Sequence, residues 1–248
     1  MDGKKERLCQ IGGVRVKIRR KSIKNLYIRI LPPNGHVVVT APEAVTLGHI
    51  EAFVKKRLSW IRRQKRHMER SVLSLIPCLE NGRILEYLGR SYTLMIRPSR
   101  QASISSEGSR LIFLVPEECE EGLLVPMLLE WYALGLRRVA SAVIERYENR
   151  IRKRVRRLRI RAMKSRWGSC SASRAAITLN LDLARLRKEL IEYVTVHEMA
   201  HLVRANHGAG FKALMDGLIP GWRLLDRELG GLSPVLCYLQ KQAEKARR

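Results

Sequence analysis

The sequence predicts an α+β protein, with a β-rich N-terminal half that contains one amphipathic helix and a mainly helical second half. Residues 14–40 and 84–115 contain short runs in which apolar and polar residues alternate, as in strands with one buried face. In residues 123–149 the apolar residues recur at helical spacing instead. We therefore expect two parts, a β-rich region at 1–118 and a second domain at 119–248.

The N-terminal region is expected to begin with a strand around residues 14–19 and a second one at 26–30. In the first strand apolar residues alternate with basic ones, which gives it one basic face: Val14, Arg15, Val16, Lys17, Ile18 and Arg19. Residues 32–35 read Pro-Pro-Asn-Gly, a strong turn signal, and a third strand follows at 36–40. The last two strands should form a hairpin.

From Leu47 the apolar spacing changes to that of an amphipathic helix, which continues through the basic run at 62–66. Residues 70–83 are expected to be a connector, because Pro77 and the turn-prone pair at 81–82 interrupt any regular spacing. Further strands are expected on the two sides of turns at Gly89-Arg90 and at residues 107–109: residues 84–88, 92–96, 104 and 111–115.

The second domain should open with a long helix at 123–149. Its apolar residues are spaced for burial: Leu124, Met127, Leu128, Trp131, Leu134 and Val139. Its aromatic residues are expected in the core rather than as a stacking surface. Residues 150–166 contain ten basic residues, and arginines alternate with apolar residues at 157–162, which predicts a strand with an arginine-covered face. Such a face suits phosphate binding, and it equally suits a solvated edge that resists aggregation.

The main chemical signal is a cluster of histidines near residue 200. The chain has six histidines, and three of them fall within eleven residues as His197, His201 and His207. Residues four apart share one face of a helix, so His197 and His201 can bind one ion, with Glu198 beside it as the general base of an H-E-x-x-H zinc site. The segment 204–208 brings Asn and Gly, which accept helix-ending left-handed conformations, and such a break lets His207 become a third ligand.

Chance occurrence is the main alternative, since H-E-x-x-H arises in many chains and helical histidines are often plain surface or core residues. Three features favour a metal: an apolar helix that should be buried, a third histidine after the break, and the small Ala200 beside the ligands. Buried His and Glu side chains without partners are costly, and a bound ion removes that cost.

The composition describes a basic chain with enough apolar residues for a real core. The net charge is +25, from 48 basic and 23 acidic residues, and 46% of the chain is hydrophobic. A surface of this charge attracts polyanions, so DNA or RNA is a candidate partner, although basic runs are also found as solvated faces. No apolar run approaches the ~20 residues of a membrane span. The charged N-terminus and five scattered cysteines predict a cytoplasmic protein with reduced thiols.

The motifs together resemble one known family. They are the run Arg166 to Cys170 (R-W-G-S-C), Ile177 to Asn180, Tyr193 to His201, Asn206-His207 and Phe211. This combination is similar to the YgjP-like metallopeptidase family, which is related to the SprT-like zincins, and the similarity extends over nearly the whole chain. It implies a zincin-like metallopeptidase domain with a small antiparallel sheet, whose strands lie beside the metal helix and leave an edge that can pair with an extended peptide.

The resemblance also implies that His197, His201 and His207 match the family's zinc ligands and Glu198 its catalytic glutamate. The spacing to the third histidine equals that of metzincins, but those need Gly where this chain has Arg204, so we exclude that subgroup.

We therefore expect a zinc (Zn²⁺) metallopeptidase acting on protein or peptide substrates. Zinc held by three neutral imidazoles lowers the pKa of water to about 7, and Glu198 is expected to take the proton as the water attacks a carbonyl. The candidate oxyanion donors are Arg166, Arg204 and Tyr193. Cys170 has no histidine near it in the sequence and is expected to be a small buried thiol.

Two other classes of function remain open. A metal-dependent nucleotide phosphohydrolase would use the same site, with the basic surface attracting a triphosphate. A basic nucleic-acid-binding protein with a structural zinc is the second, but such a zinc normally has four protein ligands and the sequence offers no fourth.

Overall fold

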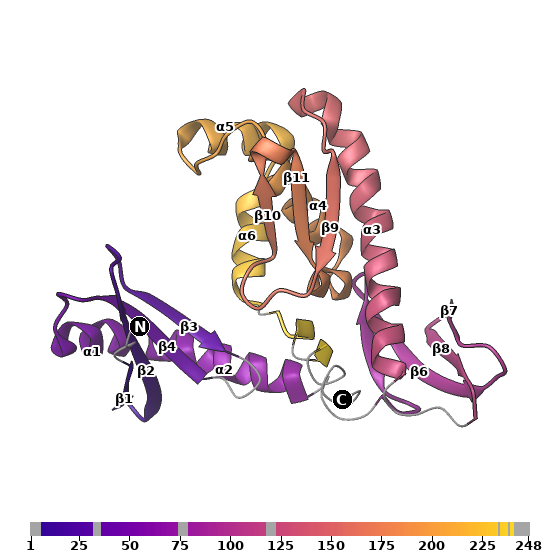
Figure 1. Cartoon of the computed structure of the whole chain (residues 1–248), viewed down its shortest axis with the longest axis horizontal. Coiled ribbons are helices and arrows are strands. Elements are labelled where there is room, and N and C mark those ends of the chain that lie inside the picture. Colours follow the sequence, from indigo (N-terminus) through magenta and orange to yellow (C-terminus); the bar gives the residue numbers. More distant parts are fainter. Residues whose placement is uncertain are drawn as a thin grey trace. The chain divides into compact units, whose positions relative to one another are not determined.

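The computed structural model describes residues 6–31, 36–73, 79–117, 123–232, 234–237 and 239–240. Within these ranges the chain forms six α-helices and three sheets, so the predicted α+β class is confirmed (Figure 1). The chain divides into two compact units, Met1–Ile76 and Pro77–Arg248. None of the helices in the described ranges is long and apolar enough to cross a membrane.

The first unit is a four-stranded sheet followed by two helices. Its elements are β1 (Glu6–Ile11), β2 (Val14–Lys21), β3 (Tyr27–Leu31), β4 (His36–Pro42), α1 (Leu47–Lys55) and α2 (Leu58–Leu73). The strand order is β1-β2-β4-β3, with antiparallel pairs at both sides and a parallel pair, β2 with β4, in the middle. Two hairpins, β1–β2 and β3–β4, are thus joined side by side.

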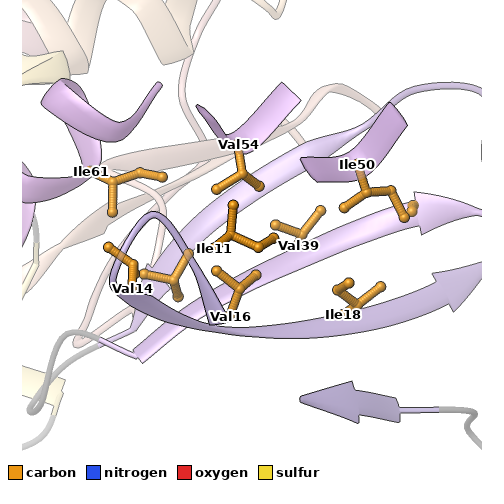
Figure 2. Close-up of a cluster of buried hydrophobic side chains, with 10 residues drawn as sticks. Ile11, Val14, Val16, Ile18, Val39, Ile50, Val54 and Ile61 are labelled. Atoms are coloured by element: carbon orange, nitrogen blue, oxygen red, sulfur yellow. The ribbon is translucent and has the colours of Figure 1, made fainter. Parts of the chain in front are cut away.

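The core of the first unit lies between the sheet and its helices. One face of the sheet supplies Val16 and Ile18, and the helices supply Ile50, Val54 and Ile61. Figure 2 shows these side chains meeting between strands and helices. The period of two in β2 explains the arrangement, because every second residue turns to the same face of the sheet. The predicted division of β2 into an apolar and a basic face is therefore confirmed.

Arg20 lies near the C-terminal end of β2 and holds this end of the strand in place. Its Nη1 donates to the carbonyl oxygens of Pro42 at 3.0 Å, Glu43 at 2.8 Å and Val45 at 2.6 Å. These bonds tie the strand to the turn that leads into α1, which begins with the Thr46 side chain accepting from the backbone N–H of His49.

The second unit begins with another four-stranded sheet. Its strands are β5 (Ile84–Tyr87), β6 (Arg90–Pro98), β7 (Ser103–Glu107) and β8 (Arg110–Val115). Their order, β5-β6-β8-β7, and their pairings repeat those of the first sheet, with two antiparallel hairpins joined by a parallel pair. The two sheets are therefore built alike.

The rest of the second unit carries the predicted site. Its elements are α3 (Leu124–Ile151), β9 (Arg157–Arg161), β10 (Gly168–Ser171), β11 (Ala176–Asn180), α4 (Lys188–Ala200), α5 (Ala209–Leu218) and α6 (Trp222–Gly230), with 3-10 turns at Ala172–Arg174 and Leu181–Arg185. The strands form a sheet of order β10-β11-β9, and α3 contacts both β9 and α4. In Figure 1 this sheet is drawn in orange beside the long helix α3.

The β5–β8 sheet is tightly joined to the elements that carry the site. The Tyr132 hydroxyl of α3 donates to the Glu86 carbonyl at 2.7 Å, and the Leu88 N–H donates to the Ala184 carbonyl at 2.7 Å. A Cβ on Gly89, which has φ +78°, would lie 2.6 Å from the Cα of Arg187 at the start of α4. These contacts explain why residues 84–115 belong to the second compact unit.

Several details differ from the sequence-based expectation. The strand β1 was not predicted, although the Gly12-Gly13 pair that turns it into β2 is a hairpin signal. The helix expected from Leu47 onward is interrupted between α1 and α2, and α2 extends to Leu73, into the predicted connector. Leu134, expected in the core, is 58% exposed.

Other expectations agree with the structure or lie outside the described residues. The hairpin of residues 26–40 is confirmed as β3–β4, while its turn at 32–35 lies outside the described residues. The small sheet was expected to be antiparallel, but it is mixed. β10 pairs with one side of β11 as an antiparallel hairpin, and β9 pairs with the other side of β11 in parallel. The contacts between residues divide the chain into two units at residues 76–77. That residues 119–248 form a domain of their own stays a prediction.

Candidate metal centre and active site

The helix α4 is the central element of the second unit. It contacts α3, α5, α6, β10 and β11, and its residues are buried on nearly every side. This burial agrees with the apolar sequence of residues 190–200. The buried Thr195 hydroxyl is satisfied within the helix by donating to the Ile191 carbonyl at 2.7 Å. His197 and Glu198 are therefore carried by a helix that is held from all sides.

The helix ends before His207, as predicted, but at Ala200 rather than in the segment 204–208, and the following turn brings His207 back to the other histidines. Ala200 is the last helical residue and His201 is the C-cap, and a tight turn follows in which the Arg204 N–H donates to the Ala200 carbonyl at 2.9 Å. The expected left-handed conformation is wrong for both candidate residues: neither Asn206 nor Gly208 has a positive φ. Gly208 is extended, with φ −70° and ψ −170°, and starts α5.

The three histidines converge, as the sequence analysis predicted. One nitrogen from each of His197, His201 and His207 lies within 4.8 Å of the other two. The Nε2 atoms of His197 and His207 are 3.0 Å apart, and the ring centroids of His201 and His207 are 4.6 Å apart. Two imidazole nitrogens at this distance need either a shared proton or a shared cation between their lone pairs.

The other nitrogens of two of these rings are held by neighbours. Nδ1 of His201 lies 3.0 Å from the Arg204 carbonyl oxygen, which can only accept, so Nδ1 carries the hydrogen and Nε2 keeps its lone pair. The Tyr193 hydroxyl donates to Asp226 Oδ1 at 2.8 Å, and its oxygen lies 3.5 Å from Nδ1 of His197. It can thus accept a long bond from that Nδ1–H, which directs Nε2 of His197 toward the cluster.

The surroundings keep His197 and His207 neutral. Burial, together with the neighbouring His201 and His207, lowers the pKa of His197 to about 4. The pKa of His207 is also lowered, first by burial and then by His201. Neutral imidazole is the form that binds a metal, so these rings can accept an ion at neutral pH without first losing a proton.

The donor set fits a zinc ion. Zinc takes three or four ligands in tetrahedral geometry, with Zn–N distances of about 2.0–2.1 Å, and three histidines with one open position are a known catalytic arrangement. The three convergent nitrogens and the two fixed tautomers meet those requirements. His197, His201 and His207 can therefore hold a metal ion.

Glu198 lies next to this cluster in a confined position. It is 7% exposed, and burial raises the pKa of its carboxyl to about 7, although the Arg166 guanidinium opposes that rise. A Cβ added to Gly168 would lie 2.6 Å from both Cγ and Oε1 of Glu198. The glycine in β10 thus makes room for the carboxylate. A carboxyl with a pKa near neutrality can accept and release a proton at physiological pH.

A cavity of about 440 Å³ opens onto Glu198 and the three histidines. One wall is formed by residues 166–172, which include β10, and the other by α4 and the turn after it. The lining residues are Arg166, Gly168, Ser169, Cys170, Ala172, His197, Glu198, His201, Ala205 and His207. This volume is in the range of ligand-binding pockets. β10 is also an edge strand: in the sheet order β10-β11-β9 it stands at one end and pairs with β11 alone.

The structure separates the three candidate oxyanion donors. Arg166 lines the cavity and is close enough to influence the pKa of Glu198. The Tyr193 hydroxyl is engaged with Asp226 and His197, and neither Tyr193 nor Arg204 is among the residues that line the cavity. Arg166 is thus the candidate with access to a bound substrate.

Cys170 also lines the cavity, but it lacks the environment of a nucleophile. Burial raises the pKa of its thiol to about 11, and the neighbouring Glu198 carboxylate acts in the same direction. Thiolates are the reactive form, so this cysteine is a protonated thiol at neutral pH. It is only partly buried, whereas the sequence predicted a buried thiol.

Two residues near the histidines were not identified from the sequence as parts of the site. Phe211 of α5 is 1% exposed, and its ring centroid lies 4.7–5.0 Å from those of all three histidines, so it forms an apolar floor under them. Asp226 of α6 reaches the site through Tyr193. No local pattern could reveal Asp226, because it lies 33 residues beyond its partner in the sequence.

A family model and a solved structure match parts of the chain. No curated protein matches the chain. Among solved structures, the metallopeptidase zymogen abylysin of Pyrococcus abyssi matches with 24% identity and a TM-score of 0.35, over 38% of this chain and 94% of that one. The model of the YgjP-like family, described as a metallopeptidase domain, matches residues 24–231, which include every residue of the site. The chain therefore belongs to the YgjP-like metallopeptidase family.

Proposed function

We propose that this protein is a zinc-dependent metallopeptidase of the H-E-x-x-H type. His197, His201 and His207 hold the zinc ion, and Glu198 is the catalytic acid–base group. The observation that carries the proposal is the convergence of three imidazole nitrogens within 4.8 Å beside a buried carboxyl at the wall of a cavity. Membership in a metallopeptidase family supports peptide hydrolysis over the other reactions of such a site.

Zinc, when bound, supplies the Lewis acidity that makes water a nucleophile near neutral pH. Glu198 then takes the proton of the attacking water on its carboxylate. The same carboxyl later gives the proton to the leaving amine, which balances the hydrolysis of one peptide bond by one water. The pKa of about 7 suits both directions of this transfer.

Arg166 is proposed to stabilise the negative charge that develops on the carbonyl oxygen. It is the one of the three oxyanion candidates that lines the cavity. A charged donor aimed at a developing oxyanion is among the strongest contributions to acyl-transfer catalysis.

The substrate is proposed to be a protein or peptide bound in extended form along β10. Gly168, Ser169 and Cys170 belong both to this edge strand and to the cavity wall. An extended peptide that pairs with such an edge gains main-chain hydrogen bonds and passes directly over the histidines.

Metal analysis and a matched active-site variant test the proposal. Wild type should contain about one zinc per chain, and His197→Ala and His207→Ala should each lose it, as expected of a three-ligand site. Glu198→Gln should retain zinc but cleave no unfolded protein substrate. Normal cleavage by Glu198→Gln, or a zinc content unaffected by both histidine substitutions, would refute the assignment.

We also propose that the substrates include proteins held on DNA or RNA, and that the protein is cytoplasmic. The net charge of +25 supports the first point. The second is supported by the cysteines: among the described residues, Cys9 and Cys170 are free thiols. DNA added at low salt should then stimulate cleavage of a DNA-binding substrate, and the absence of any stimulation would remove this refinement.

A further inference from the structure

The two sheets that are built alike differ sharply in charge. The strands β1–β4 contain seven basic residues and one acidic residue, whereas β5–β8 contain three basic and two acidic residues. The exposed positions of β6 and β7 include several serine residues. Solubility alone does not explain the difference, because the second sheet shows that this topology can be solvated without concentrated positive charge.

Four of the basic residues in the first sheet share the face that turns away from the helices: Arg15, Lys17, Arg19 and Arg29. Val16 and Ile18 point into the core in Figure 2, so the intervening Arg15, Lys17 and Arg19 lie on the opposite face. Arg29 of β3 joins them from across the sheet. In the strand register Lys17 lies opposite Val38, and Val38 lies opposite Arg29.

The spacing of these residues suits an extended polyanion. Alternate residues of a strand lie about 7 Å apart, and residues two strands apart lie about 10 Å apart. Arg15, Lys17 and Arg19 therefore form a row along β2, with Arg29 beside it. Such a row can contact successive phosphates of one backbone.

An exposed aromatic side chain lies on the same face. Tyr27 is 50% exposed, and the register places it in one row with Thr40 and Arg19. Aromatic rings on a basic sheet provide stacking surfaces for unpaired bases, which is how several sheet-based domains bind single strands. A duplex keeps its base faces stacked on each other and cannot use the ring in this way.

We propose that this surface, the basic face formed by Arg15, Lys17, Arg19, Tyr27 and Arg29, binds single-stranded nucleic acid. The arginine and lysine side chains contact phosphates, and Tyr27 stacks on a base. Binding of this kind requires neither zinc nor a peptide substrate. It can therefore be measured separately from the proposed peptidase activity, and either proposal can fail without the other.

Three variants of the full chain with equal changes in charge give the main test. In the first, the four basic residues of the basic face are replaced by glutamine: Arg15, Lys17, Arg19 and Arg29. The second changes four exposed basic residues on α1 and α2 and in the link between them: Lys55, Lys56, Arg63 and Arg66. The third changes the arginine-rich segment at β9: Arg154, Arg157, Arg159 and Arg161. Circular dichroism and zinc content confirm that each variant is folded.

Binding is measured by fluorescence anisotropy with labelled oligothymidylate and oligouridylate at several salt concentrations. The basic-face variant should bind on the order of 100-fold more weakly, with the salt slope reduced by about three, as expected for four lost phosphate contacts. The two control variants should lose only a few-fold in affinity. Similar losses in all three variants would overturn the proposal, since they would indicate general charge attraction, and so would a selective loss in the β9 variant.

Two further measurements address the nature of the partner and the role of the ring. Tyr27→Ser should weaken binding of single strands by roughly tenfold, while Ile84→Ser, at a 64% exposed position of the second sheet, should have little effect. Wild type should prefer the single strand to a duplex of equal length. Tighter binding of the duplex, or binding of phosphatidylserine vesicles without binding of oligonucleotides, would refute the proposal.

Discussion

At the scale of single residues, the burial of the Glu198 carboxyl favours catalysis but opposes folding. A buried carboxyl near neutrality suits proton transfer, but its ionised form destabilises the folded chain when no metal is present. Its pKa is raised from 4.5 in the unfolded chain to about 7. The folded state therefore binds the proton more tightly, and the stability of the metal-free protein falls as pH rises from about 4.5 to about 7.

Replacing Glu198 with Gln should remove this pH dependence. Above pH ~7 the zinc-free Glu198→Gln variant should be more stable than zinc-free wild type by roughly 3 kcal/mol, and near pH 5 the two should be nearly equal. Urea unfolding with a chelator at both pH values measures the difference. His197 also titrates in this range, but it is present in both proteins and cancels. A difference independent of pH would contradict the raised pKa.

Gly168 should be required for the position of Glu198. In Gly168→Ala the added Cβ meets Cγ and Oε1 of Glu198 at 2.6 Å, so the carboxylate must move. A displacement of about 1 Å in a catalytic group can cost on the order of 100-fold in rate. We expect kcat for peptide cleavage to fall by that order while zinc affinity is retained.

The matched control for this substitution is Gly208→Ala. Gly208 adjoins His207, has an extended backbone that alanine adopts readily, and has nothing within 4 Å of an added Cβ. It should leave kcat nearly unchanged. Equal effects of the two substitutions would show that any added methyl group near the site is disruptive, and the specific role of Gly168 would be lost.

At the scale of elements, the contact between α4 and α6 supports the metal centre from outside. Asp226 accepts from the Tyr193 hydroxyl, whose oxygen faces Nδ1 of His197. At the start of α4, Arg187 donates to Glu228 of α6 at 2.6 and 3.1 Å. The packing of Tyr193 on Trp222, with ring planes 12° apart, completes the contact. The orientation of His197 thus depends on a helix that supplies no ligand.

Disrupting this contact should weaken metal binding. Groups that orient a metal-bound histidine typically contribute 10–100-fold to affinity, so Asp226→Asn and Tyr193→Phe should each lower zinc affinity by about tenfold. Competition with a chromophoric chelator measures the effect directly. Glu145→Gln, at an exposed position on α3, is the control and should bind zinc as wild type does. Unchanged affinity in Tyr193→Phe would refute the role of the hydroxyl.

A second link between elements holds the chain near its C-terminal end against the 3-10 turn before α4. The carboxylate of Asp182, which is 1% exposed, accepts from the N–H groups of Val235 and Leu236 and lies 3.5 Å from Arg185. Asp182→Ala leaves these buried donors unpaired and should destabilise the protein by roughly 3 kcal/mol, as measured by urea unfolding. The exposed pair at Asp216 should matter far less, so Asp216→Ala serves as the comparison.

How far the sequence predicts these elements depends on the range of the interactions that form them. Local periodicity was sufficient to predict β2 and α3. The local break after His201 was sufficient to predict that His207 joins the cluster. The exposure of Leu134 and the parallel pairing of β9 with β11 depend on which neighbours cover a face, which no local pattern contains. Asp226 was missed for the same reason.

At the scale of the whole molecule, the two compact units have separate cores and different sources of stability. The core cluster between β1–β4 and the two helices is made entirely of residues from the first unit. That unit, residues 1–76, contains 18 basic and five acidic residues, so repulsion between like charges opposes its compact state. The proposed zinc ligands all lie in the second unit. Zinc and salt should therefore act on different parts of the chain.

Calorimetry should resolve two unfolding transitions that respond to different additives. A chelator should lower only the transition of the second unit, because zinc stabilises the folded state that binds it. Added salt should raise the transition of the first unit by screening its positive charges. Two core substitutions assign the transitions: Ile18→Ala should lower one and Leu179→Ala the other, each at a cost of about 2–5 kcal/mol. A single transition that zinc and both substitutions shift together would show that the units unfold as one.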